Sequence, residues 1–320
     1  MKAKLILSLL VAFWTSAISA HTIFLSPSGK DTNDGRAISR PFATLQRALD
    51  QATEQASEGS EIVVQIQPGR YIGQSAVTLA RPDGVSIKIT SASKNRPEFV
   101  GDPARKLTWL HLKSASGQPT RLTISGLLIR GYAMAISLEG DRNNARASNS
   151  KNTIQNNFFK DIGSGPDAGK NISTAAIRLV NSKSNLIANN QFEDIRNAED
   201  CSVLHAIYAA HFSSNNVIRN NRFSNLCGSA IKLRDRSNFN TIENNLFNRL
   251  QSVPAVEEWF CDKSARQDCT KRLGECPSTG THLLNNKLNN SANSKLVNII
   301  GNREPRSWCA ASDFATERIR

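Results

Sequence analysis

Eight residues of this sequence together combine side chains that could move protons with side chains that could bind negative charge. They are Arg178, His205, Tyr208, His211, Lys232, Arg234, Asp235 and Arg236. Lysine, histidine and tyrosine can take a proton from carbon or give one to a departing oxygen. Arginine and lysine can stabilise the negative charge that develops on a carboxylate when the proton beside it is removed. Such chemistry requires these side chains to lie on one surface.

Most of the eight residues fall in two copies of one sequence. HAIYAAHFSSNNVIRNNRFSNL, at 205–226, aligns without a gap with SAIKLRDRSNFNTIENNLFNRL, at 229–250, so the offset is 24 residues. A fixed period of this length predicts a solenoid in which each repeat forms one coil. Equivalent residues of neighbouring coils then lie about 4.8 Å apart.

Looser copies extend the array in both directions. They are NTIQNNFF at 152–159, SNLIANNQF at 184–192, HLLNNKL at 282–288 and VNIIGN at 297–302. Each has a short apolar run, a polar pair and a large apolar residue, which fits a strand, a tight bend and a second strand. An asparagine-rich loop would not repeat its large apolar residue in register. We therefore predict an all-β fold, a single-stranded right-handed parallel β-helix in which Phe223 stacks on Phe247.

Alternation within each strand decides which side chains face outward. The strand that begins at Ile231 alternates apolar and charged residues, so Lys232 and Arg234 should point outward. One coil earlier, Tyr208 occupies the position of Lys232. Ala210 occupies the position of Arg234, where its small side chain should leave a shallow groove.

Further residues extend this outward patch. Arg178 falls in the same column one coil before Tyr208, and His211 aligns with Asp235. Stacked cations repel one another, so the patch needs acidic partners, and Asp235 is the obvious one. We predict catalytic roles for Arg234, His211, Lys232 and Tyr208. We predict substrate contacts for Arg178, His205, Asp235 and Arg236.

The ends of the chain predict export and a capped solenoid. Residues 1–20 resemble a signal peptide, with two lysines, an apolar run and then small residues, which indicates a secreted or periplasmic protein. The apolar run is too short to span a membrane. Residues 21–320 then form one β-helix domain, which we expect to be a monomer. Within 21–58, Phe42, Leu45, Leu49 and Ala52 have helical spacing and predict a helix that caps the open end.

The chain has six cysteines, which an oxidising compartment allows to form disulfides. Cys201 and Cys227 each precede an Ala-Ile step, so they should lie on adjacent coils and pair. The other four cysteines, Cys261, Cys269, Cys276 and Cys309, leave three connectivities open. The segment 253–279 breaks the period and predicts a disulfide-held loop insert. The cysteine spacing does not fit a zinc site, and we predict no metal site.

The charge of the chain indicates an anionic partner. The formal net charge is +13, and aromatic residues make up 6% of the chain. A basic exported solenoid suits an acidic polysaccharide. Nucleic acid is the competing anion, but the sequence shows neither a stacking platform nor a helical reader motif, so we expect no nucleic-acid partner.

Several sequence segments resemble known β-helix proteins. EIVVQIQPGRYIG at 61–73 and RLTISGLLIRG at 121–131 resemble the secreted pectate-lyase-like superfamily. AIKLRDRSNFNTIENNLF, at 230–247, resembles a strand of the alginate lyase and chondroitinase B family. In that resemblance Arg234 matches the catalytic arginine. The family's catalytic lysine would fall one coil earlier, where this chain has His211 between Ala210 and Phe212, and its calcium-binding acids have no counterpart.

These observations together predict a lyase that cleaves an acidic, uronate-containing polysaccharide by β-elimination. Arg234 would neutralise the substrate carboxylate, and His211 or Lys232 would remove the proton beside it. Calcium could also neutralise the carboxylate, but no clear ligand set is present, so the cofactor stays unknown. Two alternatives stay open: a non-catalytic protein that holds an anionic glycan, and a uronate C5-epimerase. No outward carboxylate pair on adjacent coils is evident, which argues against hydrolysis.

Overall fold

The protein is described from a computed structural model, which covers residues 20–79, 85–102, 105–165, 173–262, 269, 274–291, 293–301 and 309. The predicted signal peptide therefore lies almost entirely outside the described residues. No helix in these ranges is both long and apolar enough to cross a membrane.

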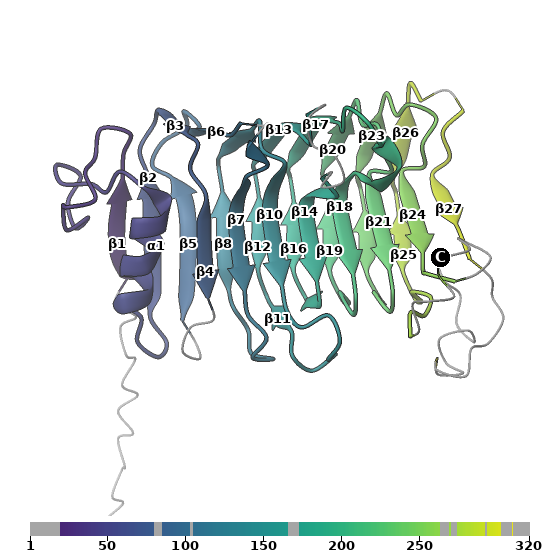
Figure 1. Ribbon diagram of the computed structural model, residues 1–320, viewed down its shortest axis with the longest axis horizontal. Helices are drawn as coiled ribbons and strands as arrows, with labels where there is room; N and C mark the ends of the chain where they lie inside the picture. Colours follow the sequence, from purple (N-terminus) through teal and green to yellow (C-terminus); the bar gives the residue numbers. More distant parts are fainter. Residues whose placement is uncertain are drawn as a thin grey trace, which may run out of the picture.

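The strands wind into an elongated parallel β-helix with three long sheets, as predicted (Figure 1). Sheet I contains β1 (Ala20–Leu25), β2 (Glu61–Ile66), β5 (Ser86–Ser91), β8 (Leu122–Ser125), β12 (Thr153–Gln155), β16 (Leu186–Ala188), β19 (Val217–Arg219), β22 (Thr241–Glu243) and β25 (His282–Leu284). Sheet II contains β4 (Ala76–Leu79), β7 (Thr108–Lys113), β10 (Met134–Glu139), β14 (Ala175–Val180), β18 (His205–Ala210), β21 (Ile231–Arg234), β24 (Val256–Trp259) and β27 (Val297–Ile299). Sheet III contains β3 (Arg70–Ile72), β6 (Glu98–Val100), β9 (Leu128–Arg130), β13 (Phe158–Ile162), β17 (Gln191–Ile195), β20 (Arg222–Ser224), β23 (Leu246–Asn248) and β26 (Lys287–Asn289). Two short strands, β11 (Asn149–Ser150) and β15 (Ser182–Lys183), pair separately, and one 3₁₀ turn spans Cys201–Val203.

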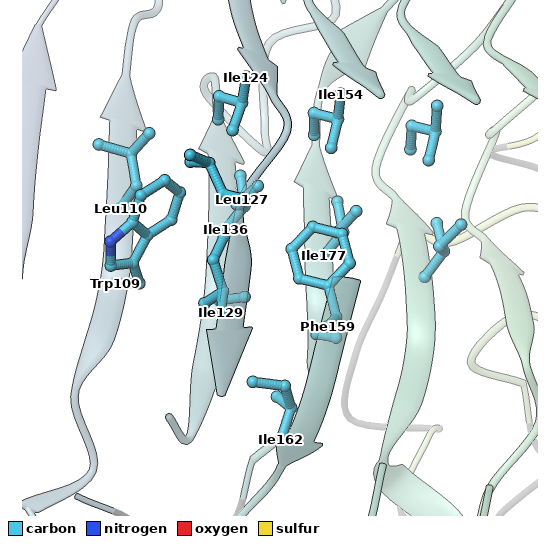
Figure 2. Close-up of a cluster of buried hydrophobic side chains, with 14 of the residues drawn as sticks. Trp109, Leu110, Ile124, Leu127, Ile129, Ile136, Ile154, Phe159, Ile162 and Ile177 are labelled. Atoms are coloured by element: carbon cyan, nitrogen blue, oxygen red, sulfur yellow. The ribbon is translucent and has the colours of Figure 1, made fainter. Parts of the chain in front are cut away.

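The interior is a set of apolar columns that run along the axis. Ile207 pairs in register with Ile231, and Phe223 with Phe247, which confirms the 24-residue alignment. The Phe223 and Phe247 rings stack with their centroids 4.9 Å apart. Figure 2 shows the same arrangement in earlier coils, where Phe159 lies among aliphatic side chains of neighbouring strands. The rings of Phe159, Phe192, Phe223 and Phe247 thus form one continuous stack across four coils.

The Asn-Asn pairs of the repeat carry out two tasks. Asn220 and Asn244 adopt positive φ values of 55°, which the bend between sheets I and III requires. The second asparagine of each pair from Asn157 to Asn245 is buried and joins a hydrogen-bonded ladder. Asn221 Nδ2 donates to Asn245 Oδ1 at 3.1 Å, and Asn190 Nδ2 donates to Asn221 Oδ1 at the same distance. The ladder satisfies amide groups that the tight bends would otherwise leave buried without partners.

Helix α1 (Leu45–Glu54) covers the first strand of sheet II and confirms the predicted helix at Leu45, Leu49 and Ala52, whereas Phe42 lies before it in a β-bridge with Leu25. Its buried side chains are Leu45, Ala48, Leu49 and Ala52. Gln46 donates from Nε2 to the carbonyl of Val77 in β4 and accepts from the amide of Val77 at 2.8 Å. The side-chain amide of Gln46 thus hydrogen-bonds to backbone groups at a strand edge that could otherwise pair with another chain.

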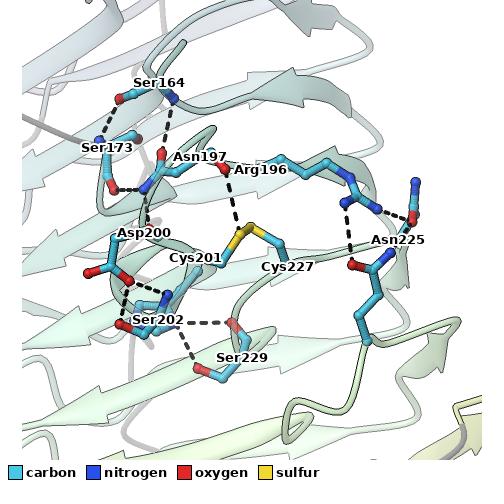
Figure 3. The surroundings of a disulfide bond; sticks show 12 residues. Ser164, Ser173, Arg196, Asn197, Asp200, Cys201, Ser202, Asn225, Cys227 and Ser229 are labelled. Atoms are coloured by element: carbon cyan, nitrogen blue, oxygen red, sulfur yellow. Dashed lines mark hydrogen bonds between the residues drawn. A yellow bond between two sulfur atoms is a disulfide. The ribbon is translucent and has the colours of Figure 1, made fainter. Parts of the chain in front are cut away.

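Three disulfides stabilise the C-terminal half of the helix. Cys201 pairs with Cys227, as predicted, and links the 3₁₀ turn to the next coil (Figure 3). The remaining bonds are Cys261–Cys269 and Cys276–Cys309. Strand β24 lies inside the segment 253–279, so the irregular loop is shorter than predicted. The Ala255-Val256 step starts another regular coil before the loop begins.

The stacked core yields a first prediction. Phe247→Ala should lower the free energy of unfolding by about 3–5 kcal/mol, because it removes a fully buried ring and leaves a cavity between neighbouring coils. Denaturant unfolding measures this change. The matched control is Phe239→Ala, since the Phe239 side chain is 54% exposed, and it should change stability far less. Equal losses in the two variants would contradict the register described above.

Candidate functional site

The predicted patch lies on the outer face of sheet II. One outward column contains Arg178, Tyr208, Lys232 and Glu257 in consecutive strands. Ala210, Arg234 and Trp259 follow one another in the adjacent column. The stacking of Arg178, Tyr208 and Lys232 confirms the prediction from the sequence. The stacking of Ala210 on Arg234 confirms it as well.

Acidic side chains meet the stacked cations, and most of them were not anticipated. Lys232 Nζ lies 2.7 Å from Glu257 Oε1. Arg178 Nη2 lies 3.0 Å from Glu139 Oε2. The repeat could have revealed Glu257, because the Ala255-Val256 step places it in the coil after Lys232. Glu139 follows the earlier Ala-Ile step in the same way.

A cleft of about 410 Å³ opens beside these columns. Its lining combines one acidic, three polar and two basic side chains with aromatic and aliphatic ones. The residues are Thr174, Ser202, Val203, His205, Tyr208, Lys232, Arg234, Glu257, Trp259 and Ile300. Ala210 does not open the predicted groove, because its short side chain is fully buried. The recess lies instead over Tyr208 and Lys232.

Tyr208 forms one end of a half-buried polar chain. Arg234 donates from Nη1 to the Tyr208 hydroxyl at 3.1 Å and from Nε to Glu275 Oε2 at 3.0 Å. Glu275 also accepts from the backbone amide of Cys261 at 2.7 Å. Burial raises the pKa of Tyr208 above its ordinary value of 10.0, although the charge of Arg234 opposes the rise. The phenol is therefore protonated at neutral pH and can donate a proton.

His205 lies next to Tyr208 in the cleft wall. The centroids of the two rings are 5.8 Å apart. Nδ1 of His205 lies 3.1 Å from the carbonyl oxygen and 2.7 Å from the hydroxyl oxygen of Ser229, so Ser229 anchors this nitrogen. Burial, followed by the charge of Lys232, lowers the pKa of His205 well below its ordinary value of 6.5. The imidazole is therefore neutral and can accept a proton.

Trp259 supplies an aromatic surface that the sequence analysis missed. Its ring lies 4.4 Å from the guanidinium carbon of Arg234 and 5.2 Å from Nζ of Lys232. Both contacts have cation–π geometry and hold the two basic side chains against the indole. A tryptophan within a polar cleft can also pack against the apolar face of a ligand. Its position in β24, one coil after Arg234, was the available signal.

His211 belongs to a second cluster at the turn that follows β18. Nδ1 of His211 lies 2.8 Å from Asp235 Oδ2, which confirms that the two residues are neighbours. Arg142 donates from Nη2 to Nε2 of His211 at 2.9 Å. Arg236 Nη1 lies 2.8 Å from Asp235 Oδ1. The eight predicted residues thus divide between the cleft, the turn cluster, and Arg178 beside Tyr208.

The turn cluster contains one group of side chains that could ligate a metal ion. His211, Asp235 and Glu275 offer ligand atoms that all lie within 4.8 Å of one another. Each of the three residues already contacts an arginine. His211 contacts Arg142, Asp235 contacts Arg236, and Glu275 contacts Arg234. Three guanidinium groups at this range would repel a divalent cation. The arrangement favours arginines held in place by acceptors over a calcium site.

Comparisons with known proteins agree with the architecture. A family model described as "Right handed beta helix region" matches residues 120–299. No curated protein matches the chain. The crystal structure of an alginate lyase from Paenibacillus sp. str. FPU-7 superposes with a TM-score of 0.53 at 13% identity, over 88% of this chain and 98% of that one. The pectate lyase Pel9A superposes with a TM-score of 0.47 at 11% identity, over 88% and 79% of the two chains. At 13% identity the likeness to the alginate lyase shows the fold alone.

The Arg234–Glu275 pair leads to a stability prediction. Arg234→Ala should lower the free energy of unfolding by about 3 kcal/mol, because Glu275 would lose its guanidinium partner while its side chain is only 9% exposed. Replacing both residues, as Arg234→Met with Glu275→Gln, should recover most of this loss. Denaturant unfolding of the three proteins tests the pair. An unstable double variant with a stable Arg234→Ala protein would contradict it.

Proposed function

The chain belongs to the right-handed β-helix family, and we propose that it binds an acidic polysaccharide in the cleft on sheet II and cleaves it by β-elimination. One observation carries the proposal: His205 and Tyr208 lie side by side in one cleft, and burial moves their pKa values in opposite directions. Groups whose environments separate their pKa values in this way are suited to act as a base and an acid.

The proposed reaction assigns one proton transfer to each ring. Nε2 of His205 removes the proton on the carbon next to the substrate carboxylate. The electron pair forms a carbon–carbon double bond, and the bond to the glycosidic oxygen breaks. Tyr208 donates its hydroxyl proton to that departing oxygen. The products are an unsaturated uronate end and a shortened chain with a free hydroxyl, and no other reactant is needed.

Other predicted residues take supporting roles in this proposal. Lys232 and Arg234 give the cleft wall its positive side chains, and Arg234 also holds the Tyr208 hydroxyl. Arg178 adjoins Tyr208 on the neighbouring coil, so it extends the column along which a polymer could bind. Asp235 and Arg236 lie in the turn cluster, from which they act on the cleft through the residues they position.

A second candidate is a non-catalytic protein that holds an anionic glycan. The observation that favours it is that Lys232 and Arg234 are held in ion pairs with Glu257 and Glu275, so neither is free to stabilise the charge that develops during proton abstraction. A uronate C5-epimerase would share the proton abstraction by His205 but return a proton to the opposite face of the same carbon. It would leave the polymer length unchanged.

Incubation with alginate, polygalacturonate and glycosaminoglycans tests the proposal. Elimination generates an unsaturated uronate, which absorbs ultraviolet light, and an epimerase or binding protein generates none. Removing one acid–base group should slow turnover about 100- to 10,000-fold, so we expect such losses in Tyr208→Phe and His205→Gln. Tyr132→Phe is the control, because it removes another buried hydroxyl, which donates to the Gln74 carbonyl far from the cleft. Undiminished turnover in Tyr208→Phe would refute the assignment.

The pKa directions also predict the pH profile. His205 acts as a base only when neutral, and its lowered pKa keeps it neutral at pH 6.5 and above. Tyr208 acts as an acid only when protonated, and its raised pKa keeps it so up to about pH 10. Initial rates should therefore give a flat kcat/KM between these two pH values. A limb that rises through pH 7 would assign the base to a group other than His205.

A further inference from the structure

We infer that Arg142 binds the substrate carboxylate beside the reacting carbon and makes the site selective for uronate sugars. The inference rests on the proposed function, because it places the carboxylate next to Tyr208. Arg142 was not among the predicted site residues, since it lies in the irregular segment that follows β10. Nothing in the repeat indicates that its side chain reaches the turn after β18, two coils away.

The first argument is that the other cations near Tyr208 already have acidic partners. Arg178 pairs with Glu139, Lys232 with Glu257, Arg234 with Glu275 and Arg236 with Asp235. Arg142 differs from these four. Within the ranges that the structure describes, no carboxylate lies at ion-pair distance from it, and its hydrogen bond goes to an imidazole nitrogen. Its side chain is exposed, so its full charge is available to a ligand.

The second argument is position. The charge of Arg142 acts on Tyr208, where it opposes the rise of the tyrosine pKa. His211, to which Arg142 donates, directly follows β18, the strand that carries Tyr208. A carboxylate held by Arg142 would therefore lie near the hydroxyl that is proposed to protonate the leaving oxygen.

The third argument is that the surrounding residues hold Arg142 in place. Asn181 donates from Nδ2 to the carbonyls of Asp141 and Asn144, at 2.8 and 2.7 Å, and so ties down both sides of the Arg142 loop. Asp235 lies 2.8 Å from Nδ1 of His211 and orients the ring. A guanidinium can only donate, so Nε2 of His211 is the acceptor in its contact with Arg142. The guanidinium is thus held by an imidazole nitrogen and not by a carboxylate.

This arrangement suits a carboxylate better than a neutral sugar. A guanidinium has five donors in a planar fork, and His211 uses one of them, so a bidentate contact with a carboxylate remains available. The same contact would stabilise the charge that builds up on the carboxylate as the neighbouring proton leaves. Arg142 then acts directly on substrate, and His211 and Asp235 act as positioning residues.

Arg142→Gln tests the inference, with Arg146→Gln as the matched control. Arg146 is exposed in the same loop, so both variants lose one charge from one segment. The probes are oligosaccharides of polygalacturonate and alginate and their carboxyl-reduced counterparts, with binding measured by calorimetry. Loss of a charged hydrogen bond should weaken uronate binding by Arg142→Gln about 10- to 100-fold. Arg142→Lys should recover only part of the affinity, because a point charge replaces the fork.

The carboxyl-reduced probes separate this inference from the proposed function. They should bind equally to the wild-type protein and to Arg142→Gln. If the wild-type protein generates no unsaturated product but binds uronates through Arg142, the inference stands and the elimination reaction is refuted. If turnover occurs and Arg142→Gln behaves like Arg146→Gln, the inference is overturned and the reaction stands. Equal wild-type affinity for intact and carboxyl-reduced probes would also overturn it.

The separate effects of His211→Ala on KM and kcat distinguish a positioning role from a merely structural one. His211→Ala removes the acceptor that holds Arg142, so KM for the polymer should rise toward the Arg142→Gln value. The rate constant at saturation should fall much less, because neither proton transfer uses His211. A fall in kcat with KM unchanged would assign His211 to the chemical step instead and overturn its positioning role.

Discussion

The structure depends on one constraint, which is that equivalent residues of successive coils stack in register. Parallel pairing places them about 4.8 Å apart, so each position must be compatible with its own counterpart one coil away. Aromatic rings meet this condition by stacking, as Phe223 does on Phe247. Asparagine meets it by hydrogen bonding to another asparagine, as Asn221 does to Asn245. A charged residue is stabilised in such a stack when an opposite charge lies within reach, as Glu257 does of Lys232.

That condition accounts for the electrostatics of the outer face. The column after Arg178 continues with a neutral tyrosine, then a lysine and then Glu257, so that two cations never stand directly on one another. Arg234 has Ala210 on one side and Trp259 on the other, and it obtains its acidic partner from the disulfide-linked region beyond β24. Pairing that stabilises the stack also removes free positive charge from the cleft. A cation that has no acidic partner and could bind a substrate carboxylate must therefore lie outside these two columns of sheet II.

How much the sequence could predict follows from the same constraint. The register of sheet II, the inward Phe247 and the Cys201–Cys227 bond were predicted correctly, because each is a consequence of a repeat that aligns without a gap. Glu257 was missed although the repeat contains it, because the Ala255-Val256 step lies within the segment that was interpreted as a cysteine-rich insert. Glu275 could not be predicted in this way. It lies 41 residues after Arg234, and its approach depends on a loop path that no local pattern encodes.

Burial explains why the proposed acid and base fall where they do. Side chains on the outer face of a solenoid usually meet water, which holds their pKa values near ordinary ones. His205 and Tyr208 differ because they are largely enclosed: His205 is only 3% exposed, and Tyr208 lies in a cleft whose wall also includes the larger side chains of Arg234 and Trp259. The same desolvation favours the neutral form of both rings, which makes the histidine an acceptor and the tyrosine a donor. Burial is thus the largest effect on both residue types, while the charge of Lys232 adds to the shift at His205 and that of Arg234 opposes the shift at Tyr208.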